Sequence, residues 1–225
     1  MGTTYQLEVI RTSSPGFINY CYLVMDCGSK EALLVDPAWE LQTITDRLDQ
    51  LGAELKAIAL THSHADHVNL VASLSTIYEP DVYMSEAEIH YYSFDCPKLK
   101  GLKDGDQLRL GDTIITALLT PGHSAGGMCY LLEDCVFTGD TLFAEGCGAC
   151  DGKGASAEQM FYSIQMLKSR LMPTMRLYPG HSFGMEPGLM MSEVEKTNLY
   201  LAISDKRSFI QFRMRKDQAS NMDFQ

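Results

Sequence analysis

Three histidines and one aspartate lie close together in the stretch Thr61-His62-Ser63-His64-Ala65-Asp66-His67. Imidazole nitrogen and carboxylate oxygen are the ligands that zinc takes when no thiolate is used. Five of the six histidines of the chain lie in this H-x-H-x-D-H stretch or in two Pro-Gly-His tripeptides, at 121–123 and 179–181. Because histidines scattered over a surface would not gather in this way, the pattern predicts a metal site.

The surrounding segments place this motif at the end of a buried strand. The apolar residues 57–60 run directly into Thr61, and residues 68–77 follow with a helix-like pattern. A chain that leaves a strand in this way turns sharply, so that neighbouring side chains can converge on one point. Gly139-Asp140 and both Pro-Gly-His tripeptides also follow strand-like runs. We therefore expect these strand ends to gather on one rim of the fold.

Length and composition limit the class of protein. The chain has 225 residues, of which 45% are hydrophobic and 21% charged, which favours one domain over residues 1–225 with a short helical and basic C-terminal appendage at 190–225. No apolar run approaches the roughly 20 residues that span a bilayer, and residues 1–11 carry no signal pattern, so we expect a cytoplasmic protein without a membrane partner. The net charge of −11 argues against nucleic acid.

The order of strand-like and helix-like segments predicts the fold class. The predicted strands are 5–11, 20–25, 32–35, 56–60, 81–84, 107–110, 113–119, 128–132, 135–138 and 176–178, and the predicted helices are 41–51, 68–77, 85–94, 157–170 and 193–203. Residues 96–103 are expected to be irregular and the last dozen residues frayed. Hairpins are too frequent for a doubly wound sheet. The pattern favours an α/β protein of the α+β kind, with two mixed β-sheets face to face and helices outside.

In its motifs the chain resembles the metallo-β-lactamase superfamily. The matching segments are Thr-His-Ser-His-Ala-Asp-His (61–67), Pro-Gly-His (121–123), Thr-Gly-Asp-Thr-Leu-Phe (138–143) and Pro-Gly-His (179–181). The glyoxalase II branch is matched further by residues 19–24 and 139–148. The resemblance covers most of residues 15–200 and implies an αββα sandwich with two metals on one rim. It implies that the first metal is bound by His62, His64 and His123, and the second by Asp66, His67 and His181, with Asp140 as the bridge.

This ligand set has a chemical logic. Two divalent ions about 3.5–4 Å apart need an anionic bridge, and Asp140 is an aspartate at a suitable strand end. Water shared by two metals loses its proton near neutral pH, and Asp66 is the predicted catalytic residue that orients the resulting hydroxide. We expect two Zn²⁺ per chain, with Fe or Mn left open by nitrogen and oxygen ligands. Such a site suits hydrolysis of an activated acyl bond, in particular a thioester.

Departures from glyoxalase II narrow the substrate. Ala149 and Asp151 stand where that family usually carries a cation and an aromatic residue that hold glutathione, and Phe183 stands where it tends to have tyrosine. The C-terminal helical domain of that family is also shortened here. In these respects the chain resembles the hydrolases of bacterial trans-acyltransferase polyketide synthase clusters. That resemblance implies an acyl thioester on the phosphopantetheine arm of an acyl carrier protein, or a small acyl thioester.

A basic stretch near the C-terminus offers a docking surface for such a carrier. Arg213, Arg215 and Lys216 belong to it, with no acidic residue among them. Because carrier proteins are typically acidic, these three residues and Phe183 are the predicted substrate or partner contacts. An ordinary solvated face explains the basic stretch equally well, and the oligomeric state is left open.

Three other functions stay open. The first is glyoxalase II itself, a hydroxyacylglutathione hydrolase, against which Ala149, Asp151 and Phe183 count. The second is a mononuclear non-haem iron sulfur dioxygenase, because such enzymes share the H-x-H-x-D-H motif. The third is a non-catalytic binding protein that kept the fold, which the retention of all seven ligand positions disfavours.

Overall fold

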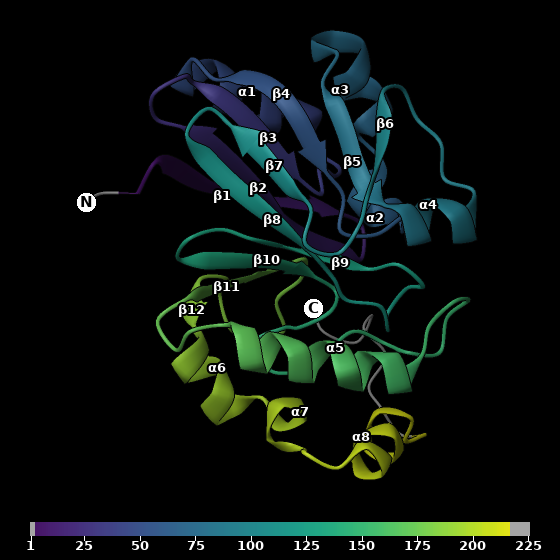
Figure 1. The fold of residues 1–225 in the computed structure, drawn as a ribbon. Coiled ribbons are helices and arrows are strands. Elements are labelled where there is room, and N and C mark those ends of the chain that lie inside the picture. Colours follow the sequence, from purple (N-terminus) through teal and green to yellow (C-terminus); the bar gives the residue numbers. More distant parts are fainter. Residues whose placement is uncertain (1–2, 217–225) are drawn as a thin grey trace.

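The computed structural model describes residues 3–216 and has four layers, helix, sheet, sheet and helix (Figure 1). The first six-stranded sheet, in the order β1 to β6, is made of β1 (Tyr5–Ser14), β2 (Phe17–Asp26), β3 (Glu31–Val35), β4 (Glu54–Ala59), β5 (Asp81–Ser85) and β6 (Leu99–Leu102). The second six-stranded sheet, in the order β12 to β7, is made of β7 (Gln107–Leu110), β8 (Thr113–Leu119), β9 (Met128–Leu131), β10 (Cys135–Gly139), β11 (Arg176–Pro179) and β12 (Leu189–Met190).

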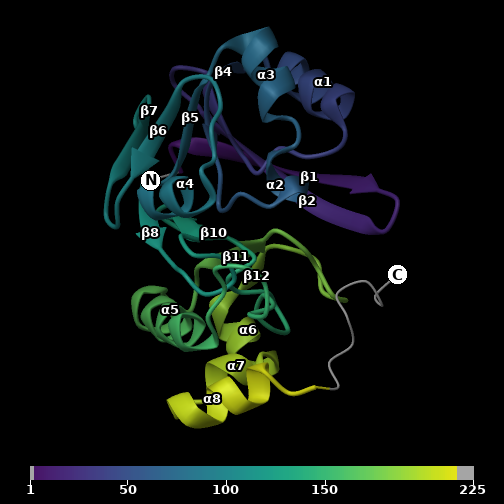
Figure 2. The same cartoon turned by 90° about the vertical axis from the view of Figure 1, so that its right-hand side faces the viewer.

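Helices cover the outer face of each sheet (Figures 1 and 2). On the first sheet they are α1 (Leu41–Leu51), α2 (Ala65–Val68), α3 (Val71–Tyr78) and α4 (Glu86–Tyr92). On the second sheet they are α5 (Ala157–Arg170), α6 (Met191–Thr197), α7 (Leu199–Ala202) and α8 (Lys206–Arg213). Both sheets mix parallel and antiparallel pairs. The predicted αββα sandwich is therefore confirmed.

Three apolar clusters hold the four layers together. The central cluster lies between the sheets and includes Tyr22, Tyr130 and Phe137, all almost fully buried. The second joins the first sheet to its helices through residues such as Ile44, and the third joins the second sheet to its helices through residues such as Ile164. Each sheet is thus apolar on both faces, which agrees with the near-continuous apolar sequence of β2 and β3.

Parallel strand pairs bring distant loops to one rim of the sandwich. Strands β3, β4 and β5 are parallel, and so are β10 and β11. Because the carboxyl ends of parallel strands meet at the same edge, the loops after them lie side by side. Two hydrogen bonds between the sheets join this rim directly, from the amide N of Tyr20 to the carbonyl of Gly180 and from that of Met128 to the carbonyl of Thr61.

Two segments differ from the sequence-based prediction because a neighbouring segment decides their structure. The helix expected at 68–77 begins later, because α2 ends at Val68 and α3 begins at Val71. At the break, Asn69 accepts a hydrogen bond from the amide of Trp39 and Leu70 donates to the carbonyl of Pro37. The expected irregular segment at 96–103 contains β6, which pairs with β5 in parallel. Its exposed central residues give no strand period, so only the pairing identifies it.

The C-terminal helices pack against α5 instead of standing apart. The helix expected at 193–203 is divided into α6 and α7, and α8 was not predicted. The Asp205 side chain accepts from the amide of Ser208 and begins α8. Val194, Leu201 and Phe209 of the three helices are buried in the same cluster as α5. The described part of the predicted C-terminal appendage, residues 190–216, therefore shares an apolar cluster with α5.

Among residues 3–216, no helix combines the length and the apolar character that crossing a membrane requires.

Candidate metal centre

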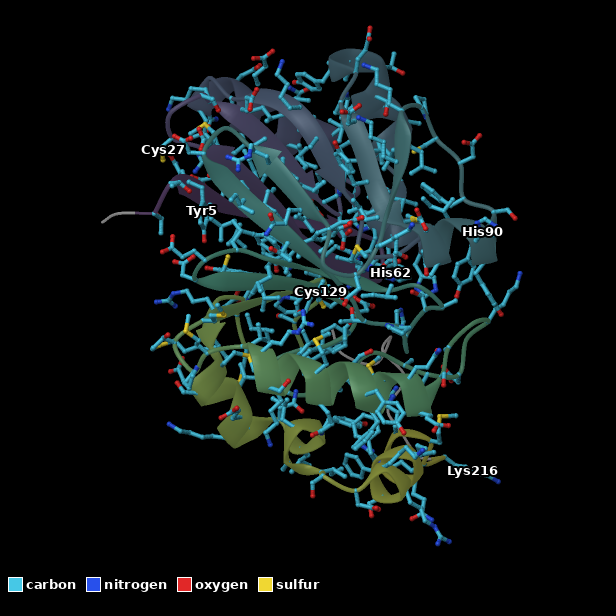
Figure 3. All side chains as sticks on the ribbon, viewed as in Figure 1. Tyr5, Cys27, His62, His90, Cys129 and Lys216 are labelled. Atoms are coloured by element: carbon cyan, nitrogen blue, oxygen red, sulfur yellow. The ribbon has the colours of Figure 1, made fainter. Side chains whose placement is uncertain are left out.

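Turns at one rim bring the seven predicted ligands together. His62 and His64 lie in the loop after β4, and Asp66 and His67 are on the short helix α2. The other three ligands follow β8, β10 and β11, and they are His123, Asp140 and His181. Figure 3 labels His62 near the junction of the two sheets and His90 at the outer edge of the molecule on α4, and His90 belongs to none of the donor groups. The structure thus brings together the five motif histidines and leaves out the sixth.

The first group consists of three imidazoles. The Nδ1 atom of His64 lies 3.0 Å from Nε2 of His62 and 3.0 Å from Nε2 of His123. His62 is buried, and the other two side chains are partly buried. Three nitrogens that converge on one point from two loops form the donor set of a tetrahedral site with one open position.

The second group joins two imidazoles to a carboxylate. The Oδ2 atom of Asp66 lies 3.2 Å from Nε2 of His181 and 3.5 Å from Nε2 of His67. His67 is almost fully buried, while His181 is partly open to solvent. This group therefore differs from the first by carrying a negative charge among its donors.

Asp140 faces both groups with different oxygens. Its Oδ2 atom lies 3.5 Å from Nε2 of His123 in the first group. Its Oδ1 atom lies 3.5 Å from Nε2 of His67 and 3.6 Å from Nε2 of His181 in the second group. A carboxylate in this position has the geometry of a bridge between two cations.

Hydrogen bonds on the outer side of four histidines leave their Nε2 atoms facing the centre. The Nδ1 atoms are bonded as follows: His62 to Thr61 Oγ1 at 3.0 Å, His67 to Asp36 Oδ2 at 2.9 Å, His123 to the carbonyl of Ala149 at 2.8 Å and His181 to the carbonyl of Ile18 at 2.7 Å. The three oxygens of Asp36, Ala149 and Ile18 can only accept, so those Nδ1 atoms carry the hydrogen. The opposite nitrogen is then a lone-pair donor, which is the arrangement found around metal-bound histidines.

Two buried atoms at the centre show that this cluster fits a cation. Nε2 of His67 and Oδ1 of Asp140 are buried and have no hydrogen-bond partner among the described residues. Leaving a buried carboxylate oxygen unpaired is costly, and buried charges are normally paired or bound to metal. Three sets of His and Asp side chains could each hold an ion, because the donor atoms within each set lie within 4.8 Å of one another. His67 belongs to two of these sets. The donor set and the unpaired atoms both fit divalent metal.

The pKa shifts of the histidines differ between the two groups. Burial lowers the pKa of His62 and of His64 below the ordinary histidine value, and neighbouring imidazoles lower it further. Burial would also lower the pKa of His67, but the carboxylates of Asp140 and Asp36 raise it to about 9. His62 and His64 therefore favour the neutral imidazole at neutral pH, whereas the neighbouring carboxylates favour the protonated form of His67.

The carboxylates of the second group stay ionised. Burial would raise the pKa of Asp66, but the hydrogen bond with His181 and the charge of His67 hold it well below its usual range. In Asp140 the same effect of burial is outweighed by the charges of His181 and His67. The pKa of His181 is raised in turn, because Asp140 and Asp66 outweigh burial.

Two buried carboxylates that position ligands were not predicted as site residues. Asp36, directly after β3, accepts a hydrogen bond from Nδ1 of His67. It also accepts from the amide of Thr61 at 2.7 Å and from the hydroxyl of Thr61 at 2.6 Å. Glu88 accepts from the amide and hydroxyl of Ser63, between His62 and His64, and from the amide of Gly126. Ser85 caps the start of α4 by accepting from the amide of Glu88, whereas the Glu88 carboxylate faces the metal loops.

Glycines in the motifs allow the ligands to approach. A Cβ atom on Gly180 would lie 2.6 Å from the ring of His67 and 2.7 Å from Oδ1 of Asp140. A Cβ atom on Gly148 would lie 2.1 Å from the carbonyl of Asp140 and 2.9 Å from the ring of His123. Side chains at these two positions would therefore displace ligands from both groups.

The predicted substrate residues are placed at different distances from this centre. The Phe183 ring lies 4.9 Å from the Phe143 ring and 6.4 Å from the His181 ring, so it borders the second group. The Arg213 guanidinium is partly buried, donates to the Tyr200 hydroxyl at 3.0 Å and lies over that ring. Figure 3 shows the exposed Lys216 at the far edge of the molecule from His62.

Comparisons with known proteins agree with this geometry. Residues 14–181 match the family described as the metallo-beta-lactamase superfamily. A Bacillus subtilis (strain 168) protein named as a probable polyketide biosynthesis zinc-dependent hydrolase is 51% identical over 224 residues, which covers 100% of both chains. The cytoplasmic isozyme of hydroxyacylglutathione hydrolase from Saccharomyces cerevisiae is 32% identical over 75% of this chain and 65% of its own.

A solved structure shows the same fold. The metallo-beta-lactamase crystal structure from Staphylococcus aureus subsp. aureus COL superposes with a TM-score of 0.85, over 96% of this chain and 69% of that one, at 22% identity. The family match, the full-length relative and the sandwich lead to one conclusion. The chain belongs to the metallo-β-lactamase superfamily, and a hydroxyacylglutathione hydrolase is among the proteins that it resembles.

Proposed function

We propose that this protein is a dinuclear zinc hydrolase that cleaves acyl thioesters, held on the phosphopantetheine arm of an acyl carrier protein, in polyketide biosynthesis. The observation that carries the proposal is the pair of donor groups that share Asp140, one facing each of its oxygens. The name of the full-length Bacillus subtilis relative supports both zinc and the pathway.

The proposal assigns a role to each predicted ligand. His62, His64 and His123 would hold the first ion, while Asp66, His67 and His181 would hold the second. Asp140 would bridge the two. Two divalent ions bound there would supply Lewis-acid polarisation of the substrate carbonyl and would lower the pKa of water.

The residues of the chain do the remaining work. Asp66 accepts hydrogen bonds on the side of the second group and would align the attacking hydroxide with the carbonyl carbon. Asp140 and Asp66 keep a negative charge at the centre, which holds the cations in place. The thiolate product needs little protonation to leave, so the reaction asks for no additional acid from the chain. A thioester is therefore the acyl substrate that this set of residues suits best.

The surroundings of the centre support a substrate other than acylglutathione. The carbonyl of Ala149 is used to orient His123, and its methyl side chain offers no charge at the position where glyoxalase II carries a cation. Asp151 is exposed and acidic. Phe183 presents an aromatic ring without a hydroxyl beside His181. Binding energy must therefore come from the acyl group, the arm or the carrier.

Rates on matched thioesters test the substrate. The purified protein is given the same acyl group on glutathione, on N-acetylcysteamine and on an acyl carrier protein. We expect the highest kcat/KM for the carrier-bound thioester and the lowest for the glutathione thioester. A preference for the glutathione thioester would overturn the proposal in favour of a hydroxyacylglutathione hydrolase.

The catalytic role of Asp66 has its own test. We expect Asp66→Asn to lower kcat by about 10²- to 10⁴-fold, as loss of a positioned acid–base group does. The first ion should remain bound, because the three histidines of the first group do not contact Asp66 in the described hydrogen bonds. Full kcat in Asp66→Asn would remove this residue from the mechanism.

The basic C-terminal stretch is proposed to attract the acidic carrier, and the structure narrows that proposal. Arg213 is partly buried against Tyr200, whereas Arg215 and Lys216 are exposed. Arg215 also donates to the carbonyl of Phe212 at 2.6 Å and lies over the ring of that residue. Reversing Arg215 and Lys216 to Glu should lower kcat/KM for the carrier-bound thioester and flatten its salt dependence, because exposed charges act mainly on encounter. Hydrolysis of the N-acetylcysteamine thioester should not change. An equal loss on both substrates would contradict a docking role.

A further inference from the structure

Asn19, near the start of β2, lies directly beneath the carboxylate of Asp66. The side chain of Asn19 is almost fully buried. Its Nδ2 atom donates to Oδ2 of Asp66 at 3.1 Å and to the backbone carbonyl of Asp66 at 2.9 Å. One amide group therefore holds both the side chain and the backbone of this residue.

The orientation of that amide is set by Trp39. The indole Nε1 of Trp39 donates to Oδ1 of Asn19 at 2.7 Å. An indole N–H can only donate, so the amide oxygen must face Trp39 and the NH₂ group must face Asp66. A flipped amide would place its oxygen against the Asp66 carboxylate and its NH₂ against the indole N–H. Both contacts of the flipped amide would be repulsive.

Trp39 is itself held in an uncommon backbone conformation. Its φ angle is +65°, a left-handed value that is rare for a bulky residue and persists where its surroundings impose it. Its amide donates to Oδ1 of Asn69 at 2.8 Å, and Nδ2 of Asn69 donates to the carbonyl of Ala65 at 2.8 Å, which begins α2. The Phe17 ring lies 5.9 Å away on its other side. The indole is therefore fixed relative to the helix that carries Asp66 and His67.

We propose that Asn19 and Trp39 are positioning residues for Asp66, and that they orient its carboxylate for the second cation through a directed chain from the indole N–H to the amide and on to Oδ2. The inference rests on the proposed dinuclear centre. Without the amide, the carboxylate of Asp66 can rotate away from the Nε2 atoms of His67 and His181. With it, Oδ2 is held on the side where those two nitrogens converge.

Zinc titration of the metal-free protein tests this role without measuring activity. In Asn19→Leu, a side chain of similar size has no donor, and we expect the second equivalent of zinc to bind about 10- to 100-fold more weakly, as for other outer partners of metal ligands. The first equivalent should bind as in the wild type. Competition with a chromophoric chelator measures both. If Asn19→Leu bound two equivalents of zinc with wild-type affinities, this inference would be overturned while the proposed dinuclear centre would stand. If the wild-type protein bound fewer than two equivalents of zinc, the proposed dinuclear centre itself would be overturned.

Trp39 is the single tryptophan of the chain, so its fluorescence reports on the same contacts. In the wild type we expect Trp39 emission to change as the second equivalent of zinc binds, because the carboxylate that anchors its hydrogen-bond chain becomes a ligand. In Asn19→Leu that change should be lost. An emission change of the same size in both proteins would contradict the chain from indole to carboxylate.

Two further variants separate positioning from general destabilisation. Trp39→Phe keeps an aromatic ring but removes the N–H, so the amide of Asn19 can turn. The affinity for the second zinc ion should fall less in Trp39→Phe than in Asn19→Leu. Asn69→Ala removes contacts to Trp39 and α2 but none to the carboxylate of Asp66, and its loss should be the smallest. Equal losses in all three variants, in parallel with their melting temperatures, would assign these residues a structural role only and overturn the proposal.

Discussion

The two donor groups of the centre are built differently, although they share Asp140. The first consists of three imidazoles, and burial lowers the pKa of His62 and His64. The second adds the Asp66 carboxylate, and the pKa values of His67 and His181 are raised. His62 and His64 thus favour the neutral form that binds a cation directly, whereas His67 and His181 favour the protonated form, in which protons compete with a cation. The same fold therefore provides two sites with unequal dependence on pH and on supporting residues.

Loss of Asp140 should have the largest effect, because it is the residue on which both groups depend. We expect Asp140→Ala to weaken both ions and to lower kcat/KM by at least about a thousandfold, since a bound cation supplies several kcal/mol of transition-state stabilisation and about 1.4 kcal/mol corresponds to tenfold. Metal analysis and thioester kinetics measure the two effects. Loss of one ion only would show that Asp140 belongs to a single group.

A pair of histidine variants should separate the groups. His181→Ala removes a donor from the second group, and His123→Ala removes one from the first. Each should lose close to one equivalent of metal while the other ion stays bound. The stoichiometry is measured after purification without chelator. If either variant lost both ions, the groups would be coupled more strongly than their separate donor sets indicate.

The buried carboxylates of Asp36 and Glu88 do not bind the ions themselves, so their removal should lower metal affinity less than the loss of a ligand does. Asp36→Asn should weaken the second ion by about 10- to 100-fold through its direct contact with His67, and the first ion less, through Thr61 and His62. Glu88→Gln should weaken the first ion by about 10- to 100-fold through Ser63 and Gly126. Chelator competition on each variant gives the two affinities, and a larger effect of Asp36→Asn on the first ion than on the second would contradict the comparison.

Acid should release the second ion before the first. A metal ligand must be a neutral imidazole, and His67 has a pKa of about 9 in the metal-free site. A raised pKa means that protons compete at neutral pH, so the second-site affinity should fall on the order of tenfold per pH unit for each displaced proton as pH decreases below about 9. The first site, where the pKa of His62 and His64 is lowered, should change little between pH 8 and 7. Zinc titrations at pH 8, 7 and 6 would show a parallel decline if the two groups were alike.

Sequence periodicity predicted the elements whose structure depends on their own residues. The strands at 107–110 and 113–119 and the helix at 157–170 are present with the predicted bounds. The missed features depend on other segments, since β6 is identified by its pairing with β5 and the break between α2 and α3 lies against the loop that holds Trp39. Residues 217–225, which belong to the last dozen residues that the sequence predicts to be frayed, lie outside the described residues.

The sequence by itself determined the kinds of donor and their grouping in motifs, because imidazoles and carboxylates after strand ends are a chemical signal that needs no partner. It also indicated the family. Only the tertiary structure decided which atoms face the centre and which residues hold them. Asp36, Glu88 and Asn19 are ordinary polar residues in their local sequence, and each becomes part of the site because a segment far along the chain brings a ligand, or for Glu88 the residue between two ligands, within about 3 Å of it. Hydrogen bonds act over such short distances that folding, and not local composition, selects their partners.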